Sequence, residues 1–319
     1  EGFCQDYFGK EVASKDKSTY KIVPQGYFAY NPSRINVGSV DWQRTQERVI
    51  VSPLYNVFSV SDKLDQQYLY YYLKSDFALQ RIKAVATGSV RDNLKLKMLY
   101  EFPINIPELS SQKNIVELLD KIKKIEGVKK AELDYFDTLV KARFVEMFNL
   151  NNCKREALGD CTDFVDYRGH TPELSEEGTI RMVNAKSVGK GFFKYIDEYI
   201  TEETYGTWMH RGFAFPGDIL FVTEGHTFGN TCIIPEDMTK FALGQRVITI
   251  KGHDEVENAF LCSYMQTDMF WKDINVYRTG GTAQGIRSKD LVKISIPVPP
   301  KEQQVGFKNF VHQVDKSKV

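Results

Sequence analysis

The sequence predicts an α+β protein in which two similar mixed α/β domains, related by pseudo-twofold symmetry, are joined by long antiparallel coiled-coil-like helices. The chain has 319 residues, of which 42% are hydrophobic, and this is enough to bury two ordinary cores. An internal repeat relates the two halves of the chain, and a long amphipathic stretch lies between the two copies. These three observations lead to the predicted fold class.

The repeat is an ungapped match at an offset of 192 residues, between Thr87–Gln112 and Thr279–Gln304. Seven of its 26 positions are identical, whereas ordinary residue frequencies would give about two by chance. The identical pairs are Thr87/Thr279, Gly88/Gly280, Lys97/Lys289, Leu99/Leu291, Ile104/Ile296, Pro107/Pro299 and Gln112/Gln304. An offset of 191 also pairs Gly26 with Gly217, so two copies of one domain are the simplest account.

Each copy shows the same order of expected elements. A glycine turn leads to a strand with alternating apolar residues, and a second strand, a helical stretch and a short apolar strand follow. The elements are expected at 26–30, 48–60, 65–82 and 102–107 in the first copy, and at 217–222, 246–250, 256–274 and 294–299 in the second. No long crossover helix separates the strands, which favours antiparallel or mixed pairing.

The stretch Glu108–Phe148 between the copies is predicted to form one long amphipathic helix, because apolar residues recur at three- and four-residue steps. About 36 helical residues make a rod of roughly 55 Å, which needs a partner helix. An equivalent helix is expected to begin at Lys301 and to pack antiparallel to it; docking of each helix on its own domain is the alternative. The expected helix and partner contacts are Ile115, Leu118, Ile122, Ile125, Phe136, Leu139, Phe310 and Val314.

Composition limits the function classes. Lys plus Arg equals Asp plus Glu at 42 each, so any contact with nucleic acid must come from local patches. The five cysteines form no C-x-x-C pair, which favours reduced thiols over disulfides or a zinc site. No apolar run approaches a membrane span and no signal peptide is recognisable, so a cytoplasmic protein without membrane contact is expected.

Catalytic and cofactor motifs were sought and not found. The stretch Asn31-Pro32-Ser33-Arg34 lacks the second proline and the aromatic residue of an adenine methyltransferase loop. The glycine-rich stretch Gly280–Gly285 lacks the lysine of a phosphate-binding loop, and the five histidines show no metal-ligand spacing. We therefore expect a non-catalytic chain with no cofactor and no metal.

An ordered set of motifs carries a family resemblance. IPVPPKEQQ (Ile296–Gln304) follows TGGTAQGIRSKDL (Thr279–Leu291) in the second copy, and DYRGHTP (Asp166–Pro172) lies near its start. The first copy matches through Tyr20–Val40 and Thr87–Gln112. This plan resembles the specificity subunits of type I restriction-modification systems, which act in host defence.

The resemblance implies a DNA-binding subunit that reads a bipartite double-stranded target. It also implies docking of methyltransferase subunits and, through them, of the restriction subunit; self-association through the long helix is expected as well. The implied organisation is a shortened first target-recognition domain (1–107), a conserved spacer helix (108–150), a second target-recognition domain (151–299) and the start of a distal conserved helix (300–319). The chain departs from the family plan in two places: the first copy is about 38 residues shorter before Gly26 than the second is before Gly217, and the distal helix stops early. A fragment or a short form is therefore expected.

Residues that would contact DNA are expected among Arg, Lys and His side chains near turns, because such groups donate to base edges and phosphates. In the second domain they are Arg168, His170, Lys186, Lys190, Arg211, His226, Arg278 and Arg287; in the first they are Arg34, Arg44, Arg91 and Lys95. Two alternatives stay open. The chain could be an interaction scaffold that docks methyltransferase subunits without reading DNA, or a DNA enzyme fused to a recognition domain.

Overall fold

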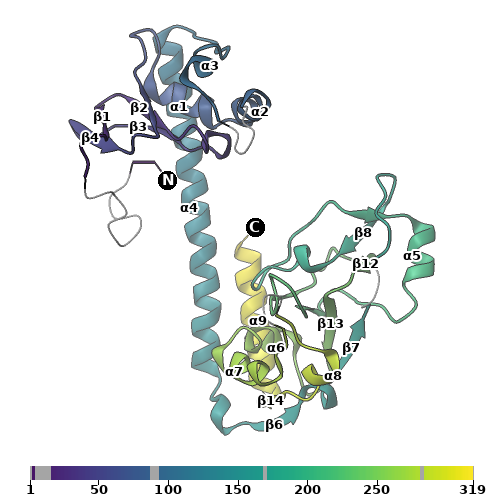
Figure 1. Ribbon diagram of the computed structural model, residues 1–319. Coiled ribbons are helices and arrows are strands. Elements are labelled where there is room, and N and C mark those ends of the chain that lie inside the picture. Colours follow the sequence, from purple (N-terminus) through teal and green to yellow (C-terminus); the bar gives the residue numbers. More distant parts are fainter. Residues whose placement is uncertain (1, 4–15, 87–92, 168–170, 281–283, 319) are drawn as a thin grey trace. The chain divides into compact units, whose positions relative to one another are not determined.

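The computed structural model describes residues 2–3, 16–86, 93–167, 171–280 and 284–318 (Figure 1). The chain divides into two compact units, residues 1–130 and 131–319. The division falls within one long helix, α4 (Leu109–Met147), so each unit contains a part of α4. A mixed composition of helix and sheet in two units agrees with the predicted fold class.

The described part of the first unit contains two small antiparallel sheets and four short helices, besides the start of α4. One sheet pairs β1 (Lys21–Pro24) with β4 (Arg48–Val51), and the other has the order β3 (Val40–Trp42), β2 (Phe28–Tyr30), β5 (Asn56–Phe58). The helices are η1 (Ile35–Val37), α1 (Gln66–Lys74), α2 (Asp76–Val85) and α3 (Leu96–Tyr100). A single core joins them, in which Phe28, Tyr30, Ile35 and Leu94 are fully buried.

The second unit has a larger antiparallel sheet at its centre, with the order β11 (Thr231–Ile233), β10 (Ile219–Val222), β13 (Val247–Gly252), β7 (Thr162–Asp166). A mixed sheet has the order β12 (Phe241–Leu243), β8 (Ile180–Val183), β9 (Tyr199–Ile200), and β14 (Ser295–Val298) pairs with β6 (Lys154–Ala157). The helices are η2 (Leu150–Asn152), η3 (Leu158–Asp160), η4 (Ala185–Ser187), α5 (Glu202–Trp208), α6 (Asn258–Tyr264), α7 (Asp268–Tyr277), α8 (Ser288–Leu291) and α9 (Lys301–Ser317).

The repeat is present in the backbone of both units. In the first, β2 pairs with β3 so that Phe28 lies opposite Trp42; in the second, β10 pairs with β11 so that Ile219 lies opposite Ile233, which is the same register shifted by 191. The turn glycines also recur, since Gly26 and its equivalent Gly217 have φ of 83° and 86°. Such left-handed positions favour glycine, which explains why the repeat is visible in the sequence at these turns.

Four expected elements differ in the structure, and one of them is the helical stretch 256–274, which forms the two helices α6 and α7 because Thr267 caps α7. The stretch 48–60 forms two strands, because a turn closed by the hydrogen bond from Tyr55 N to Ser52 O separates β4 from β5. The helical stretch 65–82 is two helices, since Ser75 ends α1 and its side chain caps α2. Residues 102–107 form no strand in the described part of the first unit, although the equivalent β14 is a strand in the second.

A buried glutamine anchors the start of each long helix. Gln112 of α4 donates two hydrogen bonds from Nε2, to Lys63 O (2.8 Å) and to Pro107 O (2.7 Å), and accepts one at Oε1 from Asp65 N (2.8 Å). Asp65 is the residue that caps α1, so this glutamine ties the start of α4 to the start of α1.

The same anchor recurs in the second unit, where Gln304 of α9 donates to Glu255 O (2.9 Å) and Pro299 O (2.7 Å) and accepts from Glu257 N (2.9 Å). All four positions are shifted by 192 from their equivalents in the first unit. Both glutamines are 0% exposed, and their amide groups satisfy the same three backbone groups.

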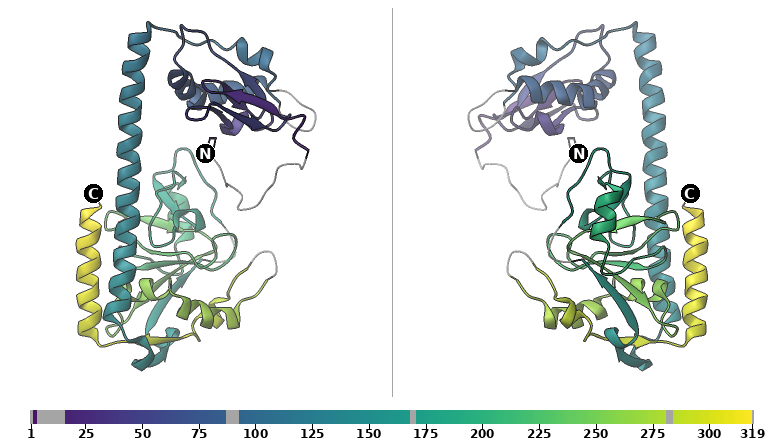
Figure 2. Two further views of the ribbon diagram at one scale, coloured as in Figure 1. Left: turned by 90° about the vertical axis from the view of Figure 1, so that its left-hand side faces the viewer. Right: turned by 90° about the vertical axis from the view of Figure 1, so that its right-hand side faces the viewer.

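Within the second unit, α9 packs antiparallel against the C-terminal part of α4 (Figure 2). The ring centres of Phe144 and Phe307 are 5.4 Å apart near the start of α9, and near its end Lys318 Nζ lies 3.1 Å from Asp137 Oδ1. Residues with higher numbers in and just after α9 thus contact residues with lower numbers in α4. This confirms the predicted antiparallel pairing of the two helices.

We expect Gln304→Met to lower the free energy of unfolding by about 3 kcal/mol, because it leaves two carbonyl groups and one amide of the buried interface without partners. Urea denaturation of the variant and of the parent chain measures the difference. The matched control is Gln303→Met, at the exposed neighbouring position, which should change stability by no more than about 0.5 kcal/mol. Equal effects of the two substitutions would contradict the anchoring role.

Candidate nucleic-acid interface

Three turns of the second unit meet around Thr223, at the end of β10. Thr223 N donates to Arg246 O, in the turn between β12 and β13, and Ile286 N donates to Thr223 O, both at 2.9 Å. Gly225 N donates to Gln284 O, also at 2.9 Å. These backbone bonds fix the three turns relative to one another.

Exposed Arg and His side chains project from these turns. They are His226, Arg246, Arg278 and Arg287. Arg246 Nε lies 3.2 Å from Oε1 of Glu224, and Arg278 Nη1 donates to Gln284 Oε1 at 3.2 Å. Each contact uses one of the five N–H donors of a guanidinium, and a planar group of this kind can make paired bonds to a phosphate or to guanine.

Arg211 is linked to the same group of residues by Asp166, which lies at the end of β7. Its Nη1 donates to Asp166 O at 3.5 Å, while Ser288, the residue after Arg287, donates from Oγ to Asp166 Oδ2 at 2.6 Å. Asp166 therefore connects the turn that carries Arg211 with the start of α8. Two further predicted residues, Arg168 and His170, lie outside the described residues.

Arg246 was not among the residues predicted from the sequence. It is the only non-glycine residue with a positive φ (70°) in the described part of the chain, and its side chain is 56% exposed. A left-handed conformation costs a non-glycine residue roughly 1 to 2 kcal/mol, and such strain is concentrated at functional sites. The tight turn Gly244–Arg246 between two apolar strands is the signal that could have drawn attention to it.

The first unit repeats one element of this arrangement. Leu94 N donates to Pro32 O at 3.1 Å, which is the equivalent of the bond from Ile286 to Thr223. Lys95 occupies the N-cap position of α3 as Arg287 occupies that of α8, and the two positions differ by 192. The structure thus places Lys95 beside the turn that carries Arg34, and both are exposed. Arg91 lies outside the described residues.

Two other predicted cations have acidic partners or a different location. Lys186 forms an ion pair with Glu198, and the hydrogen bond from Lys186 lowers the pKa of that carboxyl group. Lys190 is exposed in a turn beside β11, where the following residue Gly191 donates from its N to Thr231 O at 2.9 Å. Neither contact connects these lysines with the three turns around Thr223.

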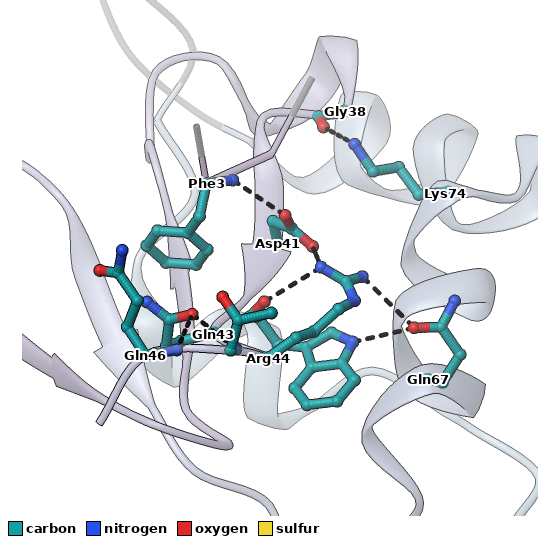
Figure 3. A network of polar contacts seen from close by, with 10 residues as sticks. Phe3, Gly38, Asp41, Gln43, Arg44, Gln46, Gln67 and Lys74 are labelled. Carbon is teal, nitrogen blue, oxygen red and sulfur yellow. Dashed lines mark hydrogen bonds and ion pairs between the residues drawn. The ribbon is translucent and has the colours of Figure 1, made fainter. Parts of the chain in front are cut away.

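Arg44 is held in a polar network of the first unit (Figure 3). Its Nη1 lies 2.7 Å from Asp41 Oδ1, and Nη2 donates to Gln67 Oε1 at 3.3 Å. The guanidinium also lies over the rings of Trp42 and Tyr70, at 4.7 and 5.0 Å from their centres. In the same network Lys74 donates to Gly38 O, and burial lowers the pKa of this lysine. These contacts give Arg44 a clear structural role.

The predicted helix contacts divide into two groups along α4. Of the predicted contacts, Phe136, Leu139 and Phe310 are half-buried. Phe144 and Met147, which follow on α4, pack in the core of the second unit. By contrast, an apolar stripe on the N-terminal part of α4 is exposed. Its residues Ile115, Leu118, Ile122 and Ile125 are exposed by 40%, 60%, 44% and 63%. Val314 of α9 is buried.

No alternative chemistry is indicated in the described residues. They contain no group of three or more His, Cys, Asp or Glu side chains that could hold a metal ion, and none of their helices is long and apolar enough to cross a membrane. Burial raises the pKa of Cys161 to about 11 and that of Cys262 to about 12, which disfavours reactive thiolates.

Comparison with known proteins gives consistent results. A family model described as type I restriction modification DNA specificity domain matches residues 8–135 and 162–319. A curated type I restriction enzyme specificity subunit of Haemophilus influenzae is 26% identical over 267 residues, which are 78% of this chain and 64% of that protein. The chain thus spans less than two thirds of the length of this relative.

Two solved structures of the same kind are similar to this chain. The S subunit of a type I restriction-modification system from M. genitalium has a TM-score of 0.56 at 17% identity, over 93% of this chain and 78% of that chain. The HsdS subunit from Thermoanaerobacter tengcongensis has a TM-score of 0.39 at 17% identity, over 95% of this chain and 77% of that chain. The similarity in fold rests on the structure from M. genitalium.

We expect Arg246→Gly to be more stable than Arg246→Ala by about 1 kcal/mol, because only glycine adopts the left-handed turn without strain and both variants lose the pair with Glu224. Thermal or urea unfolding of the two variants measures the difference. An alanine variant as stable as the glycine variant would argue against strain at this turn.

Proposed function

The chain belongs to the family of type I restriction modification DNA specificity domains, and from this premise we propose that it reads a bipartite DNA target and docks methyltransferase subunits. In this proposal residues 1–107 and 151–299 are the two target-recognition domains. The helix segments 108–150 and 300–319 separate them and bind the methyltransferase subunits, through which the restriction subunit is recruited. The chain itself carries out no catalysis.

The observation that carries this proposal is the group of cations on the three turns around Thr223. Five side chains of this surface are cationic or can become so: Arg211, His226, Arg246, Arg278 and Arg287. They project from turns that backbone hydrogen bonds hold in place, so little conformational entropy is lost when a ligand binds. A preorganised set of guanidinium groups suits both phosphate contacts and readout of guanine in the major groove.

The equivalent position in the first unit supports a second, weaker contact. Lys95 lies at the same place in the fold as Arg287, next to Arg34, but no cation of the first unit is equivalent to Arg246. We therefore assign Arg34 and Lys95 to the first half of the target, with fewer contacts than in the second. We assign Arg44 and Lys186 no direct part in binding, because Arg44 is held by Asp41, Gln67 and two aromatic rings and Lys186 lies apart from the three turns around Thr223.

A second candidate function is an interaction scaffold that docks methyltransferase subunits without reading DNA. The exposed apolar stripe on α4 favours it, since exposed stripes of this size usually bind a partner. The balance of 42 basic and 42 acidic residues is also compatible with it. Direct binding of DNA by the isolated chain separates the two functions.

We expect the chain to bind random-sequence duplexes with an affinity that falls steeply with salt. The double substitution Arg278→Ala and Arg287→Ala should lower the slope of log K against log salt by up to about 2, because each lost phosphate contact removes about 0.9. Lys316→Ala, on α9 and not on the three turns, should leave the slope unchanged. Fluorescence anisotropy at several salt concentrations measures these slopes.

Selection from the same random duplexes should enrich two short motifs at a fixed separation. Binding without salt dependence, or no enrichment of any motif, would contradict DNA reading and leave the scaffold function as the better account.

We expect the double substitution Ile122→Asp and Ile125→Asp to abolish self-association of the chain and its binding to a type I methyltransferase subunit, because it places two charges in the exposed stripe. Light scattering and a pull-down with the methyltransferase subunit measure these interactions. Val145→Asp is the matched control, since this residue is 76% exposed on another face of α4. If the control and the double variant behave alike, the stripe is not the docking surface.

A further inference from the structure

One acidic side chain lies among the Arg and His side chains on the three turns around Thr223. Glu224 follows Thr223 directly after β10 and is exposed, as are His226 and Arg246 on the same turns. DNA carries a closely spaced row of phosphates, so its backbone repels an exposed carboxylate on a surface that meets it. Binding of phosphate therefore does not explain a glutamate at this place.

Stability does not explain it either. Arg246 Nε lies 3.2 Å from Glu224 Oε1, but the two side chains are 56% and 54% exposed, and ion pairs as exposed as this one contribute little to stability. The left-handed φ of Arg246 costs free energy in addition. The pair thus has the features of a group that is kept for contact with a ligand.

The backbone on both sides of the pair is held in place. Thr223, which is fully buried, donates to Arg246 O from its N at 2.9 Å and from its Oγ1 at 3.2 Å. Gly285 forms a β-bridge with Glu224, and a Cβ at this glycine would lie 3.0 Å from the Cβ of Glu224. Glycine therefore allows the turn 284–286 to pack closely on Glu224. Both side chains start from fixed backbone positions.

The pair keeps most of its polar groups available. Within the described residues, neither Glu224 nor Arg246 has a second side-chain partner in a hydrogen bond or ion pair. A guanidinium has five N–H donors and a carboxylate has about four acceptor positions, so most of both sets remain for a ligand. Arg246 Nη1 lies 4.0 Å from the place that a Cβ of Gly225 would take, so the guanidinium extends along this turn. The pair presents donors and acceptors side by side.

A G·C base pair has the complementary pattern in the major groove. Guanine offers two acceptors there, N7 and O6, and the cytosine beside it offers its N4 amino group as a donor. A guanidinium can bond to both acceptors, while a carboxylate accepts from the amino group. In an A·T pair the donor, adenine N6, lies between two acceptors, so a guanidinium would face a donor. The pair of side chains therefore matches G·C and not A·T.

The positions of this pair are occupied differently in the first unit. The residue equivalent to Glu224 is Ser33, and the residue equivalent to Arg246 is the apolar Leu54. Neither can contribute an ion pair. Any role of the pair in reading bases therefore belongs to the second unit alone.

We propose that Glu224 and Arg246 together read one G·C pair, in the half of the target that the second unit binds. Arg246 donates to guanine, and Glu224 accepts from the amino group of the cytosine paired with it. Because phosphates repel Glu224, this residue also weakens binding to DNA without that base pair. The assignment rests on the proposed reading of DNA and adds a specificity-determining carboxylate to it.

Selection from random duplexes with the parent chain and with Glu224→Ala tests the assignment. The parent chain should require a G·C pair at one position of one half-site. In the variant this preference should fall by about tenfold, while the other half-site stays unchanged. Affinity for random duplexes should rise, because a negative charge has been removed from the surface. Glu224→Ser, which introduces the residue of the first unit, serves as the second variant if Glu224→Ala fails to fold.

The matched control is Glu236→Ala. This carboxylate is also exposed, but it lies in the turn between β11 and β12, at the other end of β10 from Thr223. The control should change neither the selected motif nor the affinity for random duplexes.

A modified base distinguishes direct contact from a structural role of Glu224. In the selected duplex, 2-pyrimidinone, which lacks the amino group, replaces the cytosine of the required G·C pair. The parent chain and Glu236→Ala should bind this duplex about tenfold more weakly than the unmodified one, whereas Glu224→Ala should bind both equally. Fluorescence anisotropy measures these affinities. A glutamate that only held Arg246 in place would leave the parent chain insensitive to the missing amino group.

The outcomes separate this assignment from the function on which it rests. If the parent chain selects no motif, the proposed reading of DNA fails and the assignment fails with it. If the parent chain selects a motif that Glu224→Ala leaves unchanged, or binds the modified and unmodified duplexes equally, the reading of DNA stands and the role of Glu224 is overturned.

Discussion

The buried glutamine at the start of each long helix is the constraint on which the rest of the arrangement depends. Gln112 and Gln304 are fully buried, and each satisfies three backbone groups, which belong to the start of a neighbouring helix and to the segment that precedes its own helix. A helix attached in this way leaves its unit in one direction. Because the three bonds are equivalent in both units, α4 and α9 leave their units in the same manner, and each helix extends the fold of its own unit.

The two units share a backbone frame but differ in their turns. The backbone bond from Leu94 to Pro32 and its equivalent from Ile286 to Thr223 place a cation at the cap of α3 and of α8, whatever the sequence of the turns. Arg246, by contrast, lies in the turn before β13, and the equivalent position in the turn before β5 of the first unit is the apolar residue Leu54. Two units with the same frame can therefore contact different groups through their turns. The proposed reading of two unlike half-sites requires such a difference.

The repeat, the left-handed glycines and the antiparallel helix pair could be predicted from the sequence, because each leaves a local or periodic signal. The strand expected at 102–107 could not, since a strand needs a partner and the equivalent of β6 is not among the described residues. Arg44 was predicted as a DNA contact, but its environment is set by Asp41, Trp42 and Gln67, which come together only in the folded unit. Arg246 was missed because its left-handed φ arises from the junction of two sheets.

The long helix α4 changes its environment along its length, and this change bears on its function. From Asp137 to Met147 it is covered by α9 and by the phenylalanines of the second unit's core, where Phe144 and Phe307 pack at 5.4 Å. Between Ile115 and Ile125 its apolar residues are exposed, and lysines flank them at Lys121, Lys123 and Lys124. Lysines beside an apolar seam keep a helix soluble while they leave the seam free for another helix. A helix that is held at its start by Gln112 and packed at its end in the core of the second unit, with such a seam exposed between, suits a part that is fixed in the fold and binds a separate partner.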